Sequence, residues 1–277
     1  MSVFSAIFLG LVQGVAEFLP ISSSGHLAVL QNIFNFQTAE EGHMFFDVLL
    51  HFGTVIAIVV AYWRDLMDIV YDVFAFFRQR KMSANQTRQI YPGMRMLFLV
   101  VIATLPLAVI LPIHDTLEQL YYKTWFIGFA FIITGCILFV SDKMPSGRKD
   151  ERTMRVRDAV VIGICQAIAT IPGISRSGST ITAGLVTGQD REYAMKFSLI
   201  MSIPAVVGAN LLSFVKALSG GVDWSLMPVY LLGTAVAMVS GYFSIVLLRR
   251  IVQRGKFGNF TYYLWGVGVF TLIVSLF

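Results

Sequence analysis

The chain has 277 residues, of which 56% are hydrophobic and only 13% charged, and its mean hydropathy is +0.73. A soluble domain carries about 25% charged residues, and its core could not bury the many long apolar stretches found here. The net charge of +5 does not indicate nucleic-acid binding, because the basic residues gather in a few clusters between apolar segments. The composition therefore predicts a polytopic helical membrane protein.

Six apolar segments are close to or above the length needed to cross a bilayer, about 17–25 helical residues. They are residues 47–63, 96–113, 124–141, 195–215, 226–248 and 258–277. Basic residues cluster between them at 64–95, 142–158, 191–196 and 249–256. Because loops rich in Lys and Arg are retained on the cytoplasmic side, these clusters predict the direction of each crossing.

Two further apolar stretches are predicted as hairpins. Residues 158–187 begin and end beside cytoplasmic charge, so this stretch should enter the membrane and turn back. Residues 1–36 have the same character, but none of the first 63 residues is Lys or Arg, so this hairpin should enter from outside. Turns at membrane depth persist only where protein shields them or where they line a cavity.

The two hairpins contain related sequences. Residues 13–26 read QGVAEFLPISSSGH and residues 166–179 read QAIATIPGISRSGS, with a constant offset of 153. Six of the 14 positions are identical: Gln13/Gln166, Ala16/Ala169, Ile21/Ile174, Ser22/Ser175, Ser24/Ser177 and Gly25/Gly178. Three crossings follow each motif, and an odd number of crossings reverses the orientation of the second copy.

The predicted fold is therefore an all-α polytopic membrane protein of two inverted-topology repeats. Each repeat consists of a re-entrant helical hairpin plus three transmembrane helices. Residues 1–141 form the first repeat, 142–157 a cytoplasmic loop, and 158–277 the second repeat, within a single membrane domain. Such repeats place a shared site near the midplane, between broken helices.

The differences between the two motifs suggest an asymmetric site for a phosphate group. Arg176 replaces Ser23 at the equivalent position and offers a planar fork of donors that matches phosphate oxygens. The surrounding hydroxyl groups and glycines can add further donors and tight turns. The predicted phosphate-binding residues are Ser22, Ser24, Gly25, Gly173, Ser175, Arg176, Ser177, Gly178, Ser179 and Thr180.

Proton-transfer and nucleophile candidates lie in the first motif. Gln13 and Glu17 are four residues apart on one helix face and could hold a divalent cation or orient a water molecule. His26 could act as nucleophile or general acid, and Ser23 is the alternative nucleophile with His26 or Glu17 as its base. A purely structural role for each residue is less favoured, because several such residues occur in one apolar loop.

A second pair of polar residues, Asp47 and His51, stands at the start of the crossing 47–63. They are also four residues apart and so share a helix face. They either touch the site or only cap the helix, and the sequence leaves both readings open.

The segments Glu17–His26 and Pro172–Thr180 resemble the two signature motifs of the bacterial undecaprenyl-diphosphate phosphatases of the bacitracin-resistance type. The resemblance covers essentially the whole chain. It implies removal of one phosphate from undecaprenyl diphosphate, which regenerates the lipid carrier for cell-wall synthesis. It also implies catalytic roles for Glu17, Ser23, His26 and Arg176, and use of Mg²⁺ or Ca²⁺. Gln13 departs from the Glu that many members carry, which argues against a mechanism with two carboxylates on this helix.

The resemblance implies a multi-pass protein of the bacterial plasma membrane with its site open to the outer face. The expected partners are the polyprenyl diphosphate lipid and the bilayer, with no nucleic acid, and a homodimer is one option for the oligomeric state. A transporter or flippase for a phosphorylated polyprenyl lipid is the alternative function, since inverted repeats with broken helices are also typical of carriers. The cluster of Glu17, Ser23 and His26 favours the enzyme, because a carrier needs no nucleophile.

Overall fold

A computed structural model describes residues 1–34, 40–78, 90–113, 116–117, 119–220 and 223–276. These ranges contain helices and no strand, with one isolated bridge between Lys149 and Gln189. The predicted all-helical class is therefore confirmed. The α-helices are α1 (Val3–Phe18), α2 (Ser23–Phe34), α3 (Glu40–Ala61), α4 (Trp63–Arg78), α6 (Pro92–Thr104), α8 (Thr124–Lys143), α9 (Val156–Ile168), α10 (Arg176–Val186), α11 (Arg191–Gly220), α12 (Met227–Gln253) and α13 (Asn259–Val274).

Four helical segments of the described chain are long and apolar enough to cross a membrane. They are Pro92–Val109, Thr124–Lys143, Arg191–Leu211 and Trp224–Gln253. A fifth span is formed if Phe45–Ala61 and Trp63–Arg78 are counted together, although the two helices are bent by 76° at their junction. The prediction of a polytopic membrane protein is thus confirmed, and four of the six predicted crossings coincide with these segments.

The prediction for residues 47–95 was wrong in one respect. The crossing 47–63 stops at a break beside Tyr62, and the predicted loop after it contains the helix α4 and the start of α6. Charged residues lower the hydropathy of α4, but Val70, Phe74 and Phe77 recur at helical spacing and are exposed. α4 is therefore an amphipathic helix. Residues 79–89 of the predicted loop lie outside the described residues.

Two predicted crossings, one of them among the four confirmed above, contain a shorter α-helix than expected. The segment 96–113 is α-helical only to Thr104 and then continues as the 3₁₀-helices Leu105–Val109 and Leu111–Ile113. Each of these short helices contains a proline, which lacks the amide hydrogen that an α-helix needs. The last crossing, predicted at 258–277, is a helix of 16 residues, about 24 Å long at 1.5 Å per residue and shorter than a hydrocarbon core of about 30 Å.

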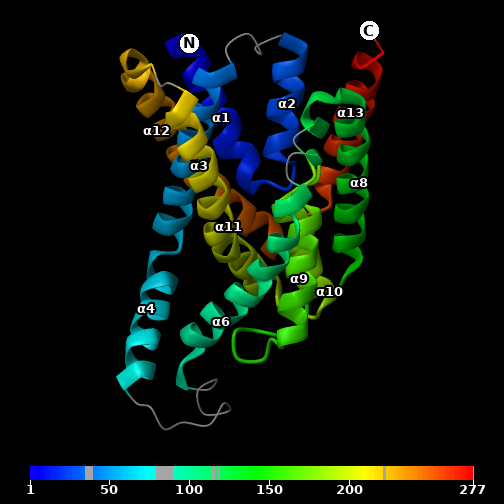
Figure 1. Ribbon diagram of the computed structural model, residues 1–277. Coiled ribbons are helices and arrows are strands. Elements are labelled where there is room, and N and C mark those ends of the chain that lie inside the picture. Colours follow the sequence, from blue (N-terminus) through cyan, green and yellow to red (C-terminus); the bar gives the residue numbers. More distant parts are fainter. Residues whose placement is uncertain (35–39, 79–89, 114–115, 118, 221–222, 277) are drawn as a thin grey trace.

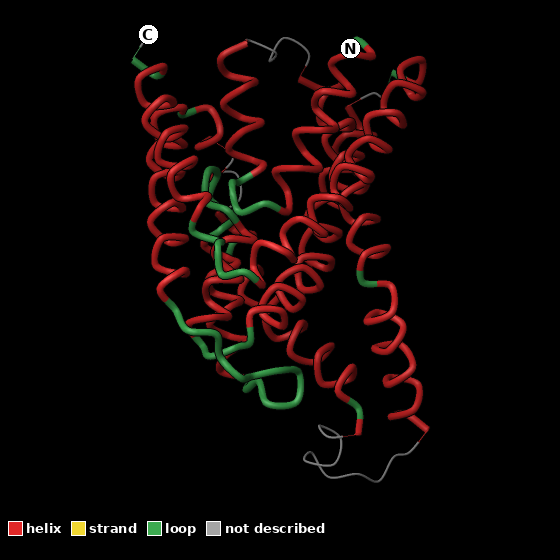
Figure 2. Tube along the Cα trace, turned by 180° about the vertical axis from the view of Figure 1, so that it is seen from behind, coloured by secondary structure: helices red, strands yellow, loops and turns green. Residues whose placement is uncertain are grey.

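Both motifs lie in helical hairpins. Residues 19–22 join α1 to α2, and residues 169–175 join α9 to α10. Figure 1 shows α1 and α2 in the half of the molecule where both termini lie, and α9 and α10 in the other half. Non-helical segments lie at mid-height among the helices (Figure 2). The motif turns are thus far from both ends of the molecule.

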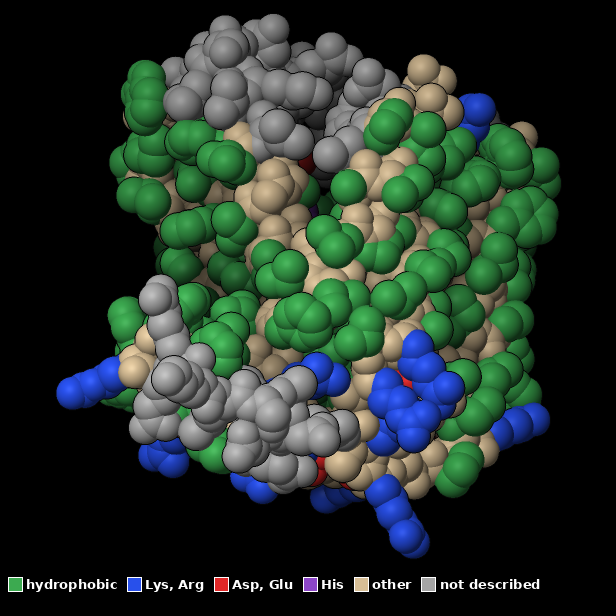
Figure 3. Space-filling view, turned by 60° about the horizontal axis from the view of Figure 1, so that its bottom comes forward, with side chains coloured by type: hydrophobic (Ala, Val, Ile, Leu, Met, Phe, Trp, Pro, Cys, Tyr) green, Lys and Arg blue, Asp and Glu red, His purple; other side chains and the backbone are tan. Residues whose placement is uncertain are grey.

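Basic side chains gather at one end of the molecule. Figure 3 shows Lys and Arg around the end that is lowest in Figure 1, with hydrophobic side chains above them. The loop between α8 and α9, at residues 144–155, lies at this end. It is two residues shorter at each side than the loop predicted at 142–157, because α8 and α9 extend further. The separation of charge from apolar surface fits a membrane protein with one strongly basic face.

The helix that carries Gln13 and Glu17 is held by close packing against α12. On α1, Gly10 and Gly14 are one turn apart and face Gly233 and Ala237 of α12. A Cβ atom on Gly14 would overlap the Ser240 hydroxyl and lie 2.5 Å from the Ala237 carbonyl oxygen. Small residues allow helix backbones in a membrane to approach this closely.

We predict that Gly14→Ala lowers the free energy of unfolding in detergent micelles by about 1–3 kcal/mol, because the added methyl group overpacks the contact of α1 with α12. Gly266→Ala on α13 is the matched control, since nothing lies within 4 Å of the place that its added methyl group would occupy. The control should leave stability unchanged or raise it by up to about 1 kcal/mol through helix propensity. Equal stability of the two variants would contradict the close packing.

Candidate active site

The first hairpin turns where its sequence forbids a continuous helix. Pro20 restricts the residue before it to extended conformations, and Leu19 accordingly ends α1 with φ −64° and ψ 146°. Ser22 then adopts a positive φ of 68°, which is uncommon for a residue with a side chain and is found at functional sites. Its hydroxyl accepts a hydrogen bond from the Gly25 amide at 3.3 Å, and α2 begins at Ser23.

The second hairpin is built on a similar pattern. Gly173 has a φ of +90°, which glycine adopts without strain. Ser175 caps α10, and its hydroxyl accepts from the Gly178 amide at 3.1 Å. The buried Thr134 of α8 fixes the turn from outside: its hydroxyl donates to the Gly173 carbonyl at 3.0 Å and accepts from the Ser175 amide at 3.2 Å.

The two turns touch each other at their glycines. A Cβ atom on Gly25 would lie 2.8 Å from the Cα atom of Gly173 and 2.7 Å from the Phe131 ring. The absence of side chains at this point allows the two backbones to approach. Each hairpin therefore ends directly against the other.

Glu17 is the centre of the contacts between the motifs. One carboxylate oxygen is paired with the Arg176 guanidinium. The other oxygen accepts from the Ser23 hydroxyl at 2.7 Å and from the Gln13 side-chain amide at 3.1 Å. The side chain of Glu17 is only 4% exposed and that of Arg176 is 28% exposed. The structure thus brings Gln13, Glu17, Ser23 and Arg176 into one cluster.

His51 belongs to this cluster as well. Its Nδ1 accepts a hydrogen bond from the Gln13 amide at 2.9 Å and lies 3.8 Å from a Glu17 oxygen. Asp47 and His51 were predicted either to touch the site or to cap a helix, and His51 does touch the site. No contact of Asp47 with the cluster occurs among the described residues.

His26 faces a different way from Ser23. Its Nδ1 donates to the Ser22 carbonyl at 2.8 Å, and its Nε2 lies 2.8 Å from the Tyr263 hydroxyl. Within the part of the chain that the structure describes, neither nitrogen bonds to Glu17 or Ser23. His26 therefore lies beside the cluster, with Tyr263 as its neighbour.

Most of the remaining predicted phosphate ligands hold the loops together. Ser24 lies 3.4 Å from the Ser22 hydroxyl, and Ser177 donates to the Leu19 carbonyl at 3.4 Å. Thr180 points toward α11, where its hydroxyl is 2.6 Å from that of Ser198. Ser179 is buried and its hydroxyl has no hydrogen-bond partner among the described residues. The amides of Gly25 and Gly178 donate to Ser22 and Ser175, so these helix starts are already capped.

Sequence analysis did not identify Tyr263 or Thr134 as neighbours of the motifs. Tyr263 is 237 positions from His26, and Thr134 is 41 positions from Ser175. Both lie in apolar helices without a motif of their own. Only their place in the fold reveals them.

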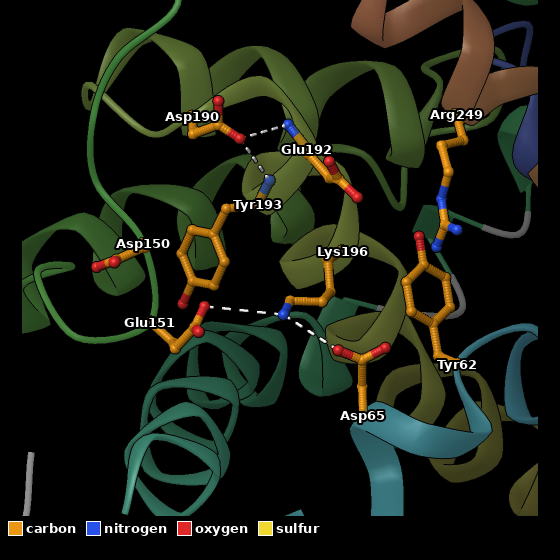
Figure 4. A pocket seen from close by; sticks show the side chains of 9 residues that line it. All are labelled: Tyr62, Asp65, Asp150, Glu151, Asp190, Glu192, Tyr193, Lys196 and Arg249. Carbon is orange, nitrogen blue, oxygen red and sulfur yellow. Dashed lines mark hydrogen bonds and ion pairs between the residues drawn. The ribbon is translucent and has the colours of Figure 1, made fainter. Parts of the chain in front are cut away.

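A separate polar pocket lies at the basic end and encloses about 280 Å³. Its lining contains no motif residue and consists of Tyr62, Asp65, Asp150, Glu151, Asp190, Glu192, Tyr193, Lys196 and Arg249 (Figure 4). The Lys196 ammonium lies 3.1 Å from Asp65 and 3.7 Å from Glu151. These ion pairs link α11 to α4 and to the loop before α9. We therefore assign the residues of this pocket a structural role at the basic end.

A family model described as bacitracin resistance protein BacA matches residues 6–270 of the chain. The chain belongs to this family. Similar proteins include the undecaprenyl-diphosphatase of Halothermothrix orenii, 37% identical over 276 residues that cover 99% of both chains. The undecaprenyl-diphosphatase of Carboxydothermus hydrogenoformans is 38% identical over 279 residues, covering 99% of this chain and 98% of the relative. That of Methanosphaera stadtmanae is 34% identical over 280 residues, covering 100% and 99%.

We predict that Thr134→Val destabilises the BacA-family fold by about 1–3 kcal/mol, because the Gly173 carbonyl and the Ser175 amide lose a buried partner. Thr271→Val is the matched control, because the Thr271 hydroxyl is also buried but has no hydrogen-bond partner among the described residues. The control should be as stable as the unmodified protein or more so. Denaturant titration in detergent measures both, and a Thr134→Val variant as stable as the control would refute the role of Thr134.

Proposed function

We propose that this protein hydrolyses undecaprenyl diphosphate, or a related polyprenyl diphosphate, to the monophosphate and inorganic phosphate. Family membership and full-length similarity to undecaprenyl-diphosphatases support this function. The observation that carries the mechanism is the contact of Glu17 with both Arg176 and Ser23. It joins an anion-binding group, a proton acceptor and a hydroxyl nucleophile at one point.

In this mechanism the substrate replaces Glu17 as the partner of Arg176. The guanidinium matches phosphate oxygens in a bidentate manner, so the diphosphate competes with the Glu17 carboxylate for it. When the diphosphate binds Arg176, the Glu17 oxygen that was paired with the guanidinium is released. Glu17 still accepts the Ser23 hydrogen bond, which is on its other oxygen.

Ser23 is the proposed nucleophile. Its oxygen forms a bond to the terminal phosphorus, the bond between phosphorus and the bridging oxygen breaks, and the Ser23 proton moves to Glu17. The lipid monophosphate leaves. Water then attacks the phosphorus of the phosphoserine and gives a proton to His26. The bond between the Ser23 oxygen and phosphorus breaks, and Ser23 recovers its proton from Glu17 as inorganic phosphate departs. His26 is three residues from Ser23 on α2, and its Nε2 points toward Tyr263 and away from Glu17, so the water must be activated on the Tyr263 side of the cluster.

A divalent cation fits the oxygen donors of this cluster. The side-chain oxygen of the buried Gln13 has no hydrogen-bond partner among the described residues, and the Glu17 carboxylate is beside it. No group of three His, Cys, Asp or Glu that could hold a metal occurs in the described ranges. We therefore propose that Gln13 and Glu17 hold Mg²⁺ or Ca²⁺ together with phosphate oxygens and water, as Mg²⁺ commonly binds. When bound, the cation would neutralise phosphate charge.

We further propose that the two halves are inverted repeats. Val3 and Val156, which begin α1 and α9, are separated by the same 153 positions as Ser23 and Arg176, which begin α2 and α10. The packing is also exchanged between the halves: α1 packs on α12, and α9 packs on α6. In this arrangement the basic end of the molecule lies on the cytoplasmic side of a cell membrane, and the site opens toward the outer face.

This topology predicts that a cysteine in the loop before α9 is labelled only from the cytoplasmic side. Arg152→Cys is suitable because the side chain is exposed, in a background in which Cys136 and Cys165 are replaced by Ala. A membrane-impermeant maleimide should label this cysteine in inverted vesicles and not in intact cells. Labelling from outside would reject both the orientation and the inverted-repeat proposal.

A carrier for a phosphorylated polyprenyl lipid is the second candidate function. It would use Arg176 and the paired hairpins, but it gives no reason for a hydrogen bond from Ser23 to Glu17. Release of inorganic phosphate from undecaprenyl diphosphate by purified protein in detergent distinguishes the two functions. A pure carrier releases none.

We predict that Glu17→Gln lowers kcat by about 10²–10⁴-fold, the range for loss of a general acid or base. KM should change little, because the Arg176 guanidinium that binds the diphosphate stays in place. Chelation of divalent cations should abolish phosphate release by the unmodified protein. Wild-type turnover in Glu17→Gln would show that the carboxylate has only a structural role.

A further inference from the structure

A neutral His26 ring has one nitrogen that can accept a proton, and this nitrogen already has a hydrogen-bond partner. A carbonyl oxygen can only accept, so Nδ1 must carry the proton that it donates to Ser22. In a neutral imidazole the lone pair then lies on Nε2. The Tyr263 hydroxyl, 2.8 Å away, is the donor to this nitrogen.

The ring is also fixed in its orientation by two aromatic neighbours. The Tyr263 ring is parallel to the imidazole within 5°, at a centroid distance of 5.7 Å. The Phe131 ring lies at 4.8 Å and is tilted by 53°. Rotation of His26 to present Nε2 elsewhere would break the Ser22 hydrogen bond and both ring contacts. Tyr263 thus holds His26 in one orientation. Its hydroxyl also occupies the position from which a water molecule would have to approach Nε2.

We infer that Tyr263 relays the proton that His26 accepts. As water attacks the phosphoserine, the Tyr263 oxygen takes a proton from that water while the Tyr263 hydroxyl proton passes to His26 Nε2. The number of protons on Tyr263 is unchanged, and His26 gains one. This inference rests on the proposed function, because it assigns a path to the second step of that reaction.

The location of Tyr263 suits this role. It is on α13, in the half of the chain that also supplies Arg176, and it is 45% exposed. The His26 ring, by contrast, is in contact with the Phe131 and Tyr263 rings. The last helix therefore places a residue next to the histidine of the first motif.

The test compares Tyr263→Phe with Tyr262→Phe. Phe retains the ring beside His26 and removes only the hydroxyl. We expect Tyr263→Phe to lower kcat on the order of 10-fold, less than the roughly 10²–10⁴-fold that accompanies loss of a general acid or base itself, with unchanged KM. The neighbouring Tyr262 is 69% exposed and packs edge-on against Trp265, so Tyr262→Phe should keep the unmodified rate.

A second measurement asks whether Tyr263 acts through His26. In a His26→Ala background, Tyr263→Phe should have no further effect on kcat, since coupled residues are not additive. An equal loss in both backgrounds, or a Tyr263→Phe variant with unchanged or higher kcat, would overturn the relay.

Rapid-quench detection of phosphoenzyme separates this result from the function itself: Tyr263→Phe should accumulate phosphoserine relative to the unmodified protein. Absence of phosphoserine in every variant would instead refute Ser23 as nucleophile, whereas absence of phosphate release would refute the phosphatase.

Discussion

The ion pair of Glu17 with Arg176 is the interaction on which the rest of this structure depends. Either charge alone would be costly at membrane depth, and each comes from a different hairpin. Both hairpins must therefore reach the same depth and end against each other. The glycine contact at their tips and the packing of α1 on α12 satisfy this requirement.

The same requirement explains how the turns are stabilised. A non-helical turn inside an apolar molecule leaves amide and carbonyl groups without helical partners. In the first turn the Ser22 hydroxyl caps α2, and in the second turn Ser175 caps α10 while Thr134 bonds to both sides of the bend. The serines common to the two motifs thus maintain the turns, whereas the residues that differ, Glu17 and Arg176, meet across them.

Comparison of the two motifs directed attention to the residues that differ, but the shared serines and glycines were predicted as phosphate ligands and not as the groups that cap the turns. The residues that differ between the motifs, Glu17, Ser23 and Arg176, do meet in one cluster. The orientation of His26 could not be predicted, since it depends on Tyr263 from a distant apolar helix. The amphipathic α4 was missed because hydropathy averages its charged and apolar faces, and the early end of α6 follows from Pro106, whose effect on a helix is local.

The 159 positions between Glu17 and Arg176 also affect how the protein is made. At a synthesis rate of about 5–20 residues per second, the ribosome needs roughly 8–30 seconds to proceed from one residue to the other. During that interval the first hairpin has a carboxylate and no guanidinium to pair with it. Until α10 is inserted, the carboxylate of the first hairpin therefore lacks the partner that offsets its cost at membrane depth. Final docking of the N-terminal helices would then be among the last events of biogenesis, although they are the first to be synthesised.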